Sequence, residues 1–287
     1  MSIYDNHISD SYSVYYYSLT SVTPTSSYLS FFLFVAGKKI MESCSKNLKR
    51  LVLELGGKDP LVIFADADLD QAASDAVTNS LSNAGQVCCS VERIYVEESV
   101  KSDFEQKVVE LAKQQKVGVP TQDGVTMGPL VTQNQLEIVK KQVDDSILNG
   151  ATRLYQSDIP EEGGNFYPVT VLTDLNQDML IQRAETFGPV VAISTFDGSE
   201  KKAVDLANDT EYGLAGYVYS GDLKRGARVA RKMRSGQVGI NCYSLNAAQL
   251  KCPWIGHKNS GFGSHSGMDG FRSFSVPKSL VFTTSAP

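Results

Sequence analysis

The stretch Asn83-Ala84-Gly85-Gln86-Val87-Cys88-Cys89-Ser90 lies between two regular patterns of the sequence. A helical pattern over residues 69–81 precedes it, and a β-rich run over residues 91–96 follows it. The stretch is therefore predicted to connect a helix to a strand, and such connections often carry functional residues. Its adjacent cysteines can pack as small hydrophobic side chains or supply a reactive thiolate, and the stretch alone favours packing.

Helical and strand patterns alternate along most of the chain around this stretch. Repeated βα units of this kind predict an α/β fold with an open, largely parallel sheet. Strands are expected near residues 51–55, 61–64, 93–96, 169–172, 190–196, 217–219 and 238–241, and helices near 38–48, 69–81, 102–115, 136–147, 201–208 and 223–233.

The first 30 residues differ in composition from the rest of the chain. They contain nine Ser and six Tyr but no Lys, Arg, Glu or Gly. This composition favours disorder over a packed helix or strand. We therefore expect an atypical, disordered segment over residues 1–35, with regular structure beginning near Gly37.

Charge and cysteine usage exclude several classes of protein. The 287-residue chain has a net charge of -5, which gives no electrostatic footprint for nucleic acid. Its five Cys and three His show no CxxC or HxxxH spacing, so no metal site is expected, and a reducing, cytoplasmic setting is the default. The longest apolar run, residues 31–36, is too short to cross a membrane.

Glu54 is a candidate general base. It lies in Leu53-Glu54-Leu55-Gly56-Gly57-Lys58, at the apolar end of an expected strand. A carboxylate that is half removed from water there has a raised pKa, which suits a base working near neutrality. The two glycines allow another part of the chain to approach the backbone closely. A Glu that faces solvent at a strand edge is the alternative.

Two later stretches carry further candidates. In Glu185-Thr186-Phe187-Gly188-Pro189, Phe187 can offer its face to a flat ring and Glu185 can accept hydrogen bonds from sugar hydroxyls. A plain loop before the next strand is the alternative. Residues 253–263 contain the only Trp, and their glycine spacing does not fit a dinucleotide-binding loop, so a structural loop closing over a pocket is expected.

The histidines do not suggest a Cys-His dyad with Cys88. Neither His257 nor His265 has a spacing that predicts contact with the thiol. If Cys88 is a nucleophile, a carboxylate that activates water is the expected base.

Taken in series, these stretches resemble the NAD(P)-dependent aldehyde dehydrogenase superfamily. The resemblance rests on residues 53–58, 85–88 and 185–189 in this order and spacing, and it extends to 208–214 and 258–261. It runs from about Gly37 to Phe282, and the whole series is far more specific than any one stretch.

The resemblance implies a thiol mechanism with NAD or NADP as cofactor. Cys88 corresponds to the nucleophile that attacks a small-molecule aldehyde, and Glu54 to the base that activates water against the resulting thioester. Glu185 and Phe187 match the contacts to the nicotinamide ribose and ring, and Gly56 is a further candidate for cofactor binding. Backbone N–H at the nucleophile helps hold the oxyanion in the family.

The resemblance also implies a division of the chain. Residues 36–56 correspond to a remnant of the Rossmann-like cofactor domain, 57–270 to the catalytic domain, and 271–287 to an oligomerisation strand and tail. Within the last segment, residues 274–282 match the strand that joins a neighbouring subunit's sheet in the family, which implies a homo-oligomer.

The N-terminal part departs from the family pattern. Most of the nucleotide-binding sheet has no counterpart, and bulky residues at 32–36 replace the small residues that receive the pyrophosphate. We therefore expect an N-terminally truncated enzyme with weakened NAD(P) binding. A cofactor-independent thiol esterase and an inactive fragment that assembles with full-length subunits are the alternatives.

Overall fold

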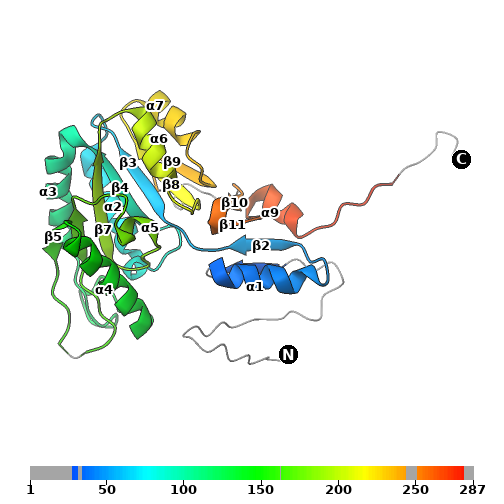
Figure 1. Cartoon of the computed structure of the whole chain (residues 1–287), viewed down its shortest axis with the longest axis horizontal. Helices are drawn as coiled ribbons and strands as arrows, with labels where there is room; N and C mark the ends of the chain where they lie inside the picture. The colour runs from blue at the N-terminus through cyan, green and yellow to red at the C-terminus, as the bar shows by residue number, and fades with distance from the viewer. Residues whose placement is uncertain (1–27, 32–33, 162, 244–250, 281–287) are drawn as a thin grey trace, which may run out of the picture.

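The main body of the chain is a seven-stranded sheet in the order β5-β6-β7-β4-β3-β8-β9 (Figure 1). The computed structural model describes residues 28–31, 34–161, 163–243 and 251–280. All neighbouring strands are parallel except β5 and β6, so the predicted α/β fold with a largely parallel sheet is confirmed. The strands are β3 (Asp59–Ile63), β4 (Val91–Glu97), β5 (Thr152–Gln156), β6 (Thr170–Thr173), β7 (Val190–Phe196), β8 (Ala215–Tyr219) and β9 (Gln237–Ile240).

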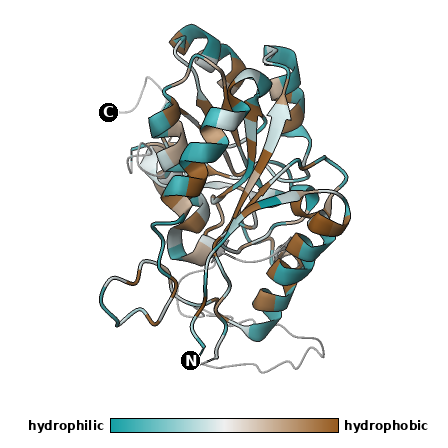
Figure 2. Cartoon of the chain, turned by 90° about the vertical axis from the view of Figure 1, so that its left-hand side faces the viewer, coloured by the Kyte–Doolittle hydropathy of each residue, from teal (hydrophilic) through white to brown (hydrophobic). Residues whose placement is uncertain are grey.

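Helices cover both faces of this sheet. Leu61 and Ile63 of β3 join one core with α2, α3 and α4, whereas Val62 joins a second core with α6 and α7. Successive strand residues point to opposite faces, so these near-continuous apolar strands are buried on both sides. In Figure 2 the outer faces of the helices are largely hydrophilic. The helices are α1 (Phe34–Ser45), α2 (Leu69–Leu81), α3 (Lys101–Ala112), α4 (Gln133–Leu148), α5 (Leu180–Arg183), α6 (Glu200–Asn208), α7 (Leu223–Ala230) and α9 (Gly267–Ser273).

A smaller sheet of three strands lies beside the main body (Figure 1). Its central strand β2 (Leu51–Glu54) is parallel to β1 (Tyr28–Phe31) and antiparallel to β11 (Gly261–Phe262). A two-stranded antiparallel ribbon of β10 (Trp254–Ile255) and β12 (Ser264–His265) continues from β11. Because β2 leads into β3 within a few residues, Glu54 lies at the junction of the two sheets.

The N-terminal segment differs in part from the expected disorder. Residues 28–31 form β1, because their backbone pairs with β2, a long-range interaction that composition does not report. Residues 1–27 lie outside the described part of the chain. The helix expected from residue 38 begins at Phe34.

The C-terminal strand expected over residues 274–282 stays a prediction. The described residues 274–280 follow α9 and run away from the body without joining a strand of the described chain (Figure 1). Residues 281–282 lie outside the described range. None of the helices in the described part of the chain has the length and apolar character needed to cross a bilayer.

Candidate active site

Four of the stretches singled out in the sequence meet at one edge of the main sheet. Residues 53–58, 83–90, 185–189 and 208–214 lead into β3, β4, β7 and β8, respectively. Parallel neighbouring strands begin at the same edge, so these distant stretches are brought together there. This is the amino edge, whereas ligands of open α/β sheets more commonly bind at the carboxyl edge.

Two glycines bring the Glu54 segment against the other stretches. A Cβ on Gly57 would lie 2.1 Å from the carbonyl oxygen of Cys88. A Cβ on Gly56 would lie 2.6 Å from Oε2 of Glu185. A side chain at either position would collide with its neighbour, so the contacts depend on glycine.

Gly85 makes a third close approach, and its replacement is expected to disturb the site. Its φ is +74°, and a Cβ would lie 2.0 Å from the carbonyl oxygen of Gly188. Gly85→Ala therefore adds a backbone clash to a left-handed conformation that itself costs about 1–2 kcal/mol. We expect a lower midpoint of urea unfolding and altered labelling of Cys88 by iodoacetamide.

Gly150→Ala is the matched control. Gly150 also has a positive φ, +100°, but a Cβ there would meet nothing within 4 Å. This variant should show the conformational cost alone and leave Cys88 labelling unchanged. Equal losses for the two variants would contradict the close approach of Gly85 to Gly188.

Cys88 lies in the turn that follows α2 and the short helix η1 (Ser82–Gly85). The side-chain amide of Gln86 fixes this turn by donating to the carbonyl oxygen of Asn83 at 3.0 Å. The C-terminal end of a helix carries partial negative charge, so α2 does not favour a thiolate. The pKa of Cys88 is nevertheless lowered, chiefly by a hydrogen bond with the Cys89 side chain, while burial and the charge of Glu54 oppose this shift.

Cys89 is buried in the hydrophobic core, and its side chain also forms a hydrogen bond with the Cys88 thiol. It is 1% exposed, and its Sγ lies 3.4 Å from the hydroxyl of Tyr243. The hydroxyls of Tyr217 and Tyr243 donate to its carbonyl oxygen at 2.9 and 3.2 Å. Cys88 and Cys89 are both free thiols, so no disulfide joins them.

Glu54 is buried at the end of β2, with 2% of its surface exposed. The indole Nε1 of Trp254 donates to its Oε2 at 2.7 Å. Its Oε1 accepts no hydrogen bond within the described part of the chain, and Nε2 of His265 lies 3.9 Å away. Burial raises the pKa of Glu54 to about 7, and the bond from Trp254 opposes this shift. The carboxylate can therefore take up a proton near neutral pH.

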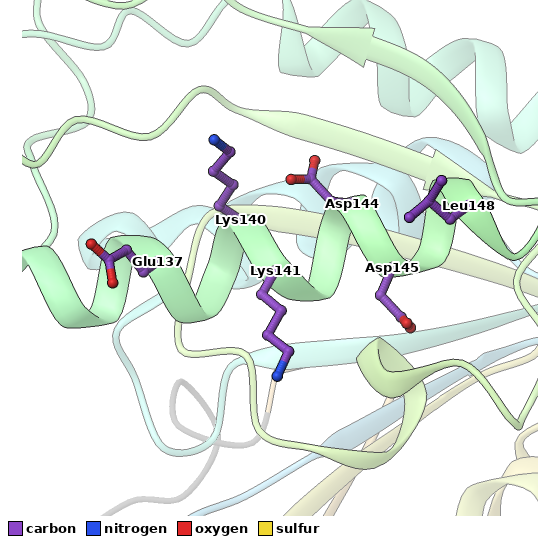
Figure 3. Close-up of a pocket in the computed structure, with 6 residues that line it drawn as sticks. All are labelled: Glu137, Lys140, Lys141, Asp144, Asp145 and Leu148. Carbon is purple, nitrogen blue, oxygen red and sulfur yellow. The ribbon is translucent and has the colours of Figure 1, made fainter.

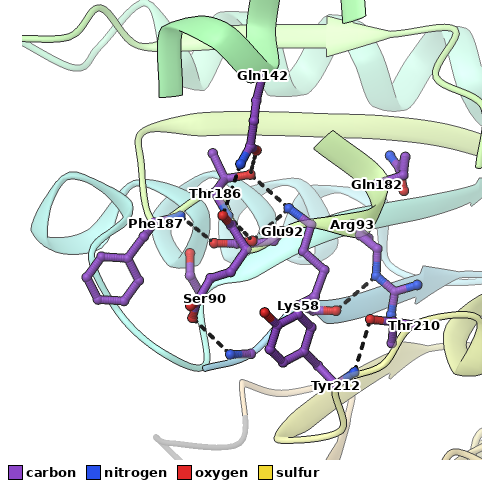
Figure 4. Close-up of polar contacts among 12 residues, drawn as sticks. Lys58, Ser90, Glu92, Arg93, Gln142, Gln182, Thr186, Phe187, Thr210 and Tyr212 are labelled. Carbon is purple, nitrogen blue, oxygen red and sulfur yellow. Dashed lines mark hydrogen bonds and ion pairs between the residues drawn. The ribbon is translucent and has the colours of Figure 1, made fainter. Parts of the chain in front are cut away.

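Glu185 and Phe187 lie on the loop before β7. Oε1 of Glu185 accepts the backbone N–H of Gly57 at 2.9 Å. Burial, and then the charge of Glu92, raise the pKa of Glu185 to about 8. Phe187 has a φ of +49°, and Figure 4 shows its ring pointing away from the polar contacts behind it.

A buried ion pair that sequence reasoning missed holds this loop (Figure 4). Nζ of Lys58 lies 2.7 Å from Oε2 of Glu92, and the two side chains are 0% and 6% exposed. Both carboxylate oxygens of Glu92 also accept backbone N–H groups, from Thr186 and Phe187, at 2.8 Å. Nζ of Lys58 donates to the Thr186 hydroxyl at 2.8 Å. The pair therefore fixes the backbone on which Glu185 and Phe187 stand.

Residues 258–261 connect the stretch 208–214 to β2. Lys258 donates through Nζ to the carbonyl oxygens of Asn208 and Thr210 at 2.9 and 3.0 Å. Ser260 accepts the N–H of Gly213 through its hydroxyl at 3.0 Å and the N–H of Leu55 through its carbonyl at 3.1 Å. These bonds hold the strand that carries Glu54.

A surface hollow of about 410 Å³ along α4 is not part of this site. Figure 3 shows its lining side chains directed to both sides of the helix instead of converging on one point. It therefore presents no built binding site. The hollow is lined by Glu137, Lys140, Lys141, Asp144, Asp145 and Leu148.

No group of side chains suited to a metal ion occurs in the described part of the chain.

A thiol and a buried carboxyl whose segments meet at one sheet edge are suited to enzymes that use covalent thiol catalysis. The sequence model described as "Aldehyde dehydrogenase family" matches residues 34–280. This chain therefore belongs to the aldehyde dehydrogenase family.

Individual relatives agree with this assignment. A chloroplastic aminoaldehyde dehydrogenase of Arabidopsis thaliana is 38% identical over 257 residues, which are 88% of this chain and 51% of that protein. The betaine aldehyde dehydrogenase of Bacillus subtilis is 39% identical over 86% of this chain and 51% of its own length. The chain thus spans about half the length of the curated relatives it matches.

Solved structures show the same fold. Lactaldehyde dehydrogenase of Escherichia coli matches with a TM-score of 0.81 and 32% identity, over 86% of this chain and 52% of that one. Betaine aldehyde dehydrogenase of Staphylococcus aureus, solved in complex with NAD+, matches with a TM-score of 0.78 and 35% identity, over 86% of this chain and 49% of that one.

Proposed function

We propose that the chain carries the catalytic part of an oxidoreductase that converts an aldehyde to a carboxylic acid with NAD(P)+. Cys88 is the nucleophile and Glu54 the general base. One observation carries this proposal: the segment that carries the buried Glu54 carboxyl meets the Cys88 turn at one sheet edge, where a Cβ on Gly57 would lie 2.1 Å from the carbonyl oxygen of Cys88.

In this mechanism the Sγ of Cys88 bonds to the aldehyde carbon, and the backbone N–H of Cys88 stabilises the oxyanion. A nicotinamide, when bound, would accept a hydride from the former aldehyde carbon, so that the group on Cys88 becomes a thioester. Glu54 then takes a proton from water as the water oxygen bonds to the thioester carbon. The C–S bond breaks, and its electron pair returns to Cys88.

The cofactor-facing roles of Glu185, Phe187 and Gly56 fit the nicotinamide end of NAD(P). Gly56 leaves space in which the Glu185 carboxyl lies, and the half-buried ring of Phe187 is free of the network behind it. Oε1 of Glu185 holds the N–H of Gly57 at 2.9 Å, and the second carboxylate oxygen, Oε2, can accept a ribose hydroxyl.

We expect weak binding of NAD+, because residues 32–36 are bulky where the family pattern has the small residues that receive the pyrophosphate. Calorimetric titration of the chain with NAD+ should therefore give an affinity weaker than micromolar. Micromolar affinity would contradict the prediction, and the same titration with NADP+ tests which cofactor is preferred.

Glu54→Gln tests the proposed base. Because the amide cannot take a proton from water, we expect a normal acylation burst with a p-nitrophenyl ester but deacylation slower by roughly 10²-fold or more. In the wild type, deacylation should rise with pH and level off above about 7, because the base acts only when its carboxyl is deprotonated.

Glu137→Gln is a matched control at an exposed position of α4. It should deacylate like the wild type at every pH. Wild-type turnover in Glu54→Gln would remove Glu54 from the mechanism.

A cofactor-independent thiol esterase is the second candidate function. It is favoured because acylation of Cys88 and deacylation by Glu54 need no hydride acceptor. Ester turnover without nucleotide, together with no aldehyde oxidation in its presence, would select this function.

Substrate class, assembly and compartment are further parts of the proposal. The names of the relatives make betaine aldehyde, aminoaldehydes and lactaldehyde the first substrates to test.

Residues 271–287 join a second copy or a full-length subunit, and the exposure of Phe271, Val276 and Leu280 supports this role. A reducing compartment such as the cytoplasm suits the five free cysteines.

A further inference from the structure

His265 lies between the buried Glu54 carboxyl and the protein surface. Its Nε2 is 3.9 Å from Oε1 of Glu54, and the two side chains are 25% and 2% exposed, respectively. Its Nδ1 lies 3.0 Å from the hydroxyl of Ser266. One imidazole nitrogen, Nε2, therefore faces Oε1 of Glu54. The other, Nδ1, lies within hydrogen-bonding distance of the Ser266 hydroxyl.

The ribbon of β10 and β12 holds His265 in this place. Trp254 and His265 are directly opposite each other in the antiparallel register, with their ring centroids 6.3 Å apart. Directly opposite residues of a ribbon share a face. The same ribbon thus directs the indole to Oε2 of Glu54 and the imidazole to Oε1.

Oε1 is the oxygen that remains available for proton transfer. Oε2 accepts from Trp254, whereas Oε1 accepts no hydrogen bond in the described part of the chain. A carboxyl that takes a proton in every catalytic cycle must release it before the next one. A neighbouring side chain that accepts the proton provides a route for this release.

We propose that His265 is the proton exit of the site, with Nε2 accepting from Oε1 of Glu54 the proton that this carboxylate takes from the hydrolytic water. The inference rests on the proposed function of Cys88 and Glu54. His265 acts through Glu54 and does not touch the reacting atoms.

The proton balance is closed within these groups. Neutral His265 with its proton on Nδ1 donates to Ser266, which leaves the Nε2 lone pair toward Glu54. After Nε2 accepts the proton, the imidazolium releases the Nδ1 proton toward Ser266 and solvent. Exchange of the tautomer restores the starting state. The 3.9 Å separation exceeds hydrogen-bond reach, so a side-chain rotation must close it by about 1 Å.

Glu54 is a charged neighbour of His265, with its Oε1 3.9 Å from Nε2 of the imidazole. Burial lowers the pKa of His265, so the imidazole is neutral near pH 7 and holds an accepted proton only briefly before passing it on. On α9, which packs against β12, Asp269 and Arg272 pair with each other at exposed positions. From the other side, the Cys88 thiol is the titratable group that senses the charge of Glu54.

His265→Ala is the first test. With a p-nitrophenyl ester, the acylation burst should stay at the wild-type rate, while deacylation falls by roughly 10- to 10²-fold. Added imidazole should restore deacylation, which it would not do if the side chain were needed only for packing. His257→Ala is the matched control, because His257 is an exposed histidine on the same segment, and it should behave like the wild type.

The nitrogen spectra of the histidines give a second test that needs no turnover. The chain has only three histidines, so His265 can be assigned by comparison with the variant. Its ring nitrogens should shift as Glu54 titrates between about pH 6 and 8, and this shift should vanish in Glu54→Gln.

The outcomes separate the two proposals. No burst in the wild type would overturn the proposed function and the proton exit with it. A normal burst would leave the function standing. In that case, unchanged deacylation in His265→Ala, failure of imidazole to restore it, or a His265 titration indifferent to Glu54→Gln would each overturn the proton exit alone.

Discussion

Cys88→Ala is expected to lower the rate of p-nitrophenyl ester hydrolysis by at least about 10³-fold, because it removes the atom that forms the covalent intermediate. The burst of p-nitrophenol, one equivalent per chain in the wild type, should disappear with it. Rapid mixing followed at the absorbance of p-nitrophenol measures both quantities. Loss of the burst together with the turnover would identify Cys88 as the acylated group.

Cys89→Ala is the matched control for this experiment. Cys89 is adjacent and more deeply buried, and its hydrogen bond is the largest contribution to the lowered pKa of Cys88. The variant should keep the burst but need a higher pH to reach the wild-type rate. A burst that survives in Cys88→Ala and vanishes in Cys89→Ala would assign the nucleophile to Cys89 instead.

Glu92→Leu is expected to produce the largest loss of stability. The substitution leaves the buried ammonium of Lys58 without its carboxylate partner. It also removes the acceptor of the Thr186 and Phe187 N–H groups. Breaking one partner of a buried ion pair typically costs about 3–5 kcal/mol of unfolding free energy. Urea unfolding followed by circular dichroism measures this loss.

Two further variants make the interpretation specific. The double variant Lys58→Met with Glu92→Leu keeps neither charge of the buried pair. Its loss of unfolding free energy should therefore be smaller than the sum of the losses in the two single variants. Lys201→Ala breaks an exposed pair with Asp205 and should leave the unfolding midpoint unchanged. Additive losses in the double variant would show that the buried pair contributes no coupling.

Much of the main sheet could be predicted from local patterns. The strand expected at residues 190–196 is β7 with the same bounds, because a continuous run of apolar and β-branched residues is buried on both faces. β5 was not predicted, since it is the antiparallel edge strand and none of its residues is buried. β1 and β11 were not predicted either, because they depend on pairing with β2 across distant parts of the chain.

The candidate site was predictable to a different degree for different residues. Cys88, Glu54, Glu185 and Phe187 were recognisable because their stretches occur in a series that resembles a family. The partnership of Glu54 with Trp254 was not recognisable, since the two residues are 200 positions apart and no local pattern relates them. One signal was present in the sequence: Glu92 and Arg93 lie in a strand that was expected to be buried, and buried charged side chains need partners. The partner of Glu92 is Lys58.

The collection of the site at the amino edge of the sheet has a consequence for folding kinetics. Its contacts join positions that are far apart in sequence, such as Gly57 with Glu185, 128 residues away. Contacts of such long range form late, because closing the intervening loops costs entropy that only the assembled sheet offsets. During refolding, the native reactivity of the Cys88 thiol should therefore appear after the secondary structure has formed. The time at which it appears would report when the native state is complete.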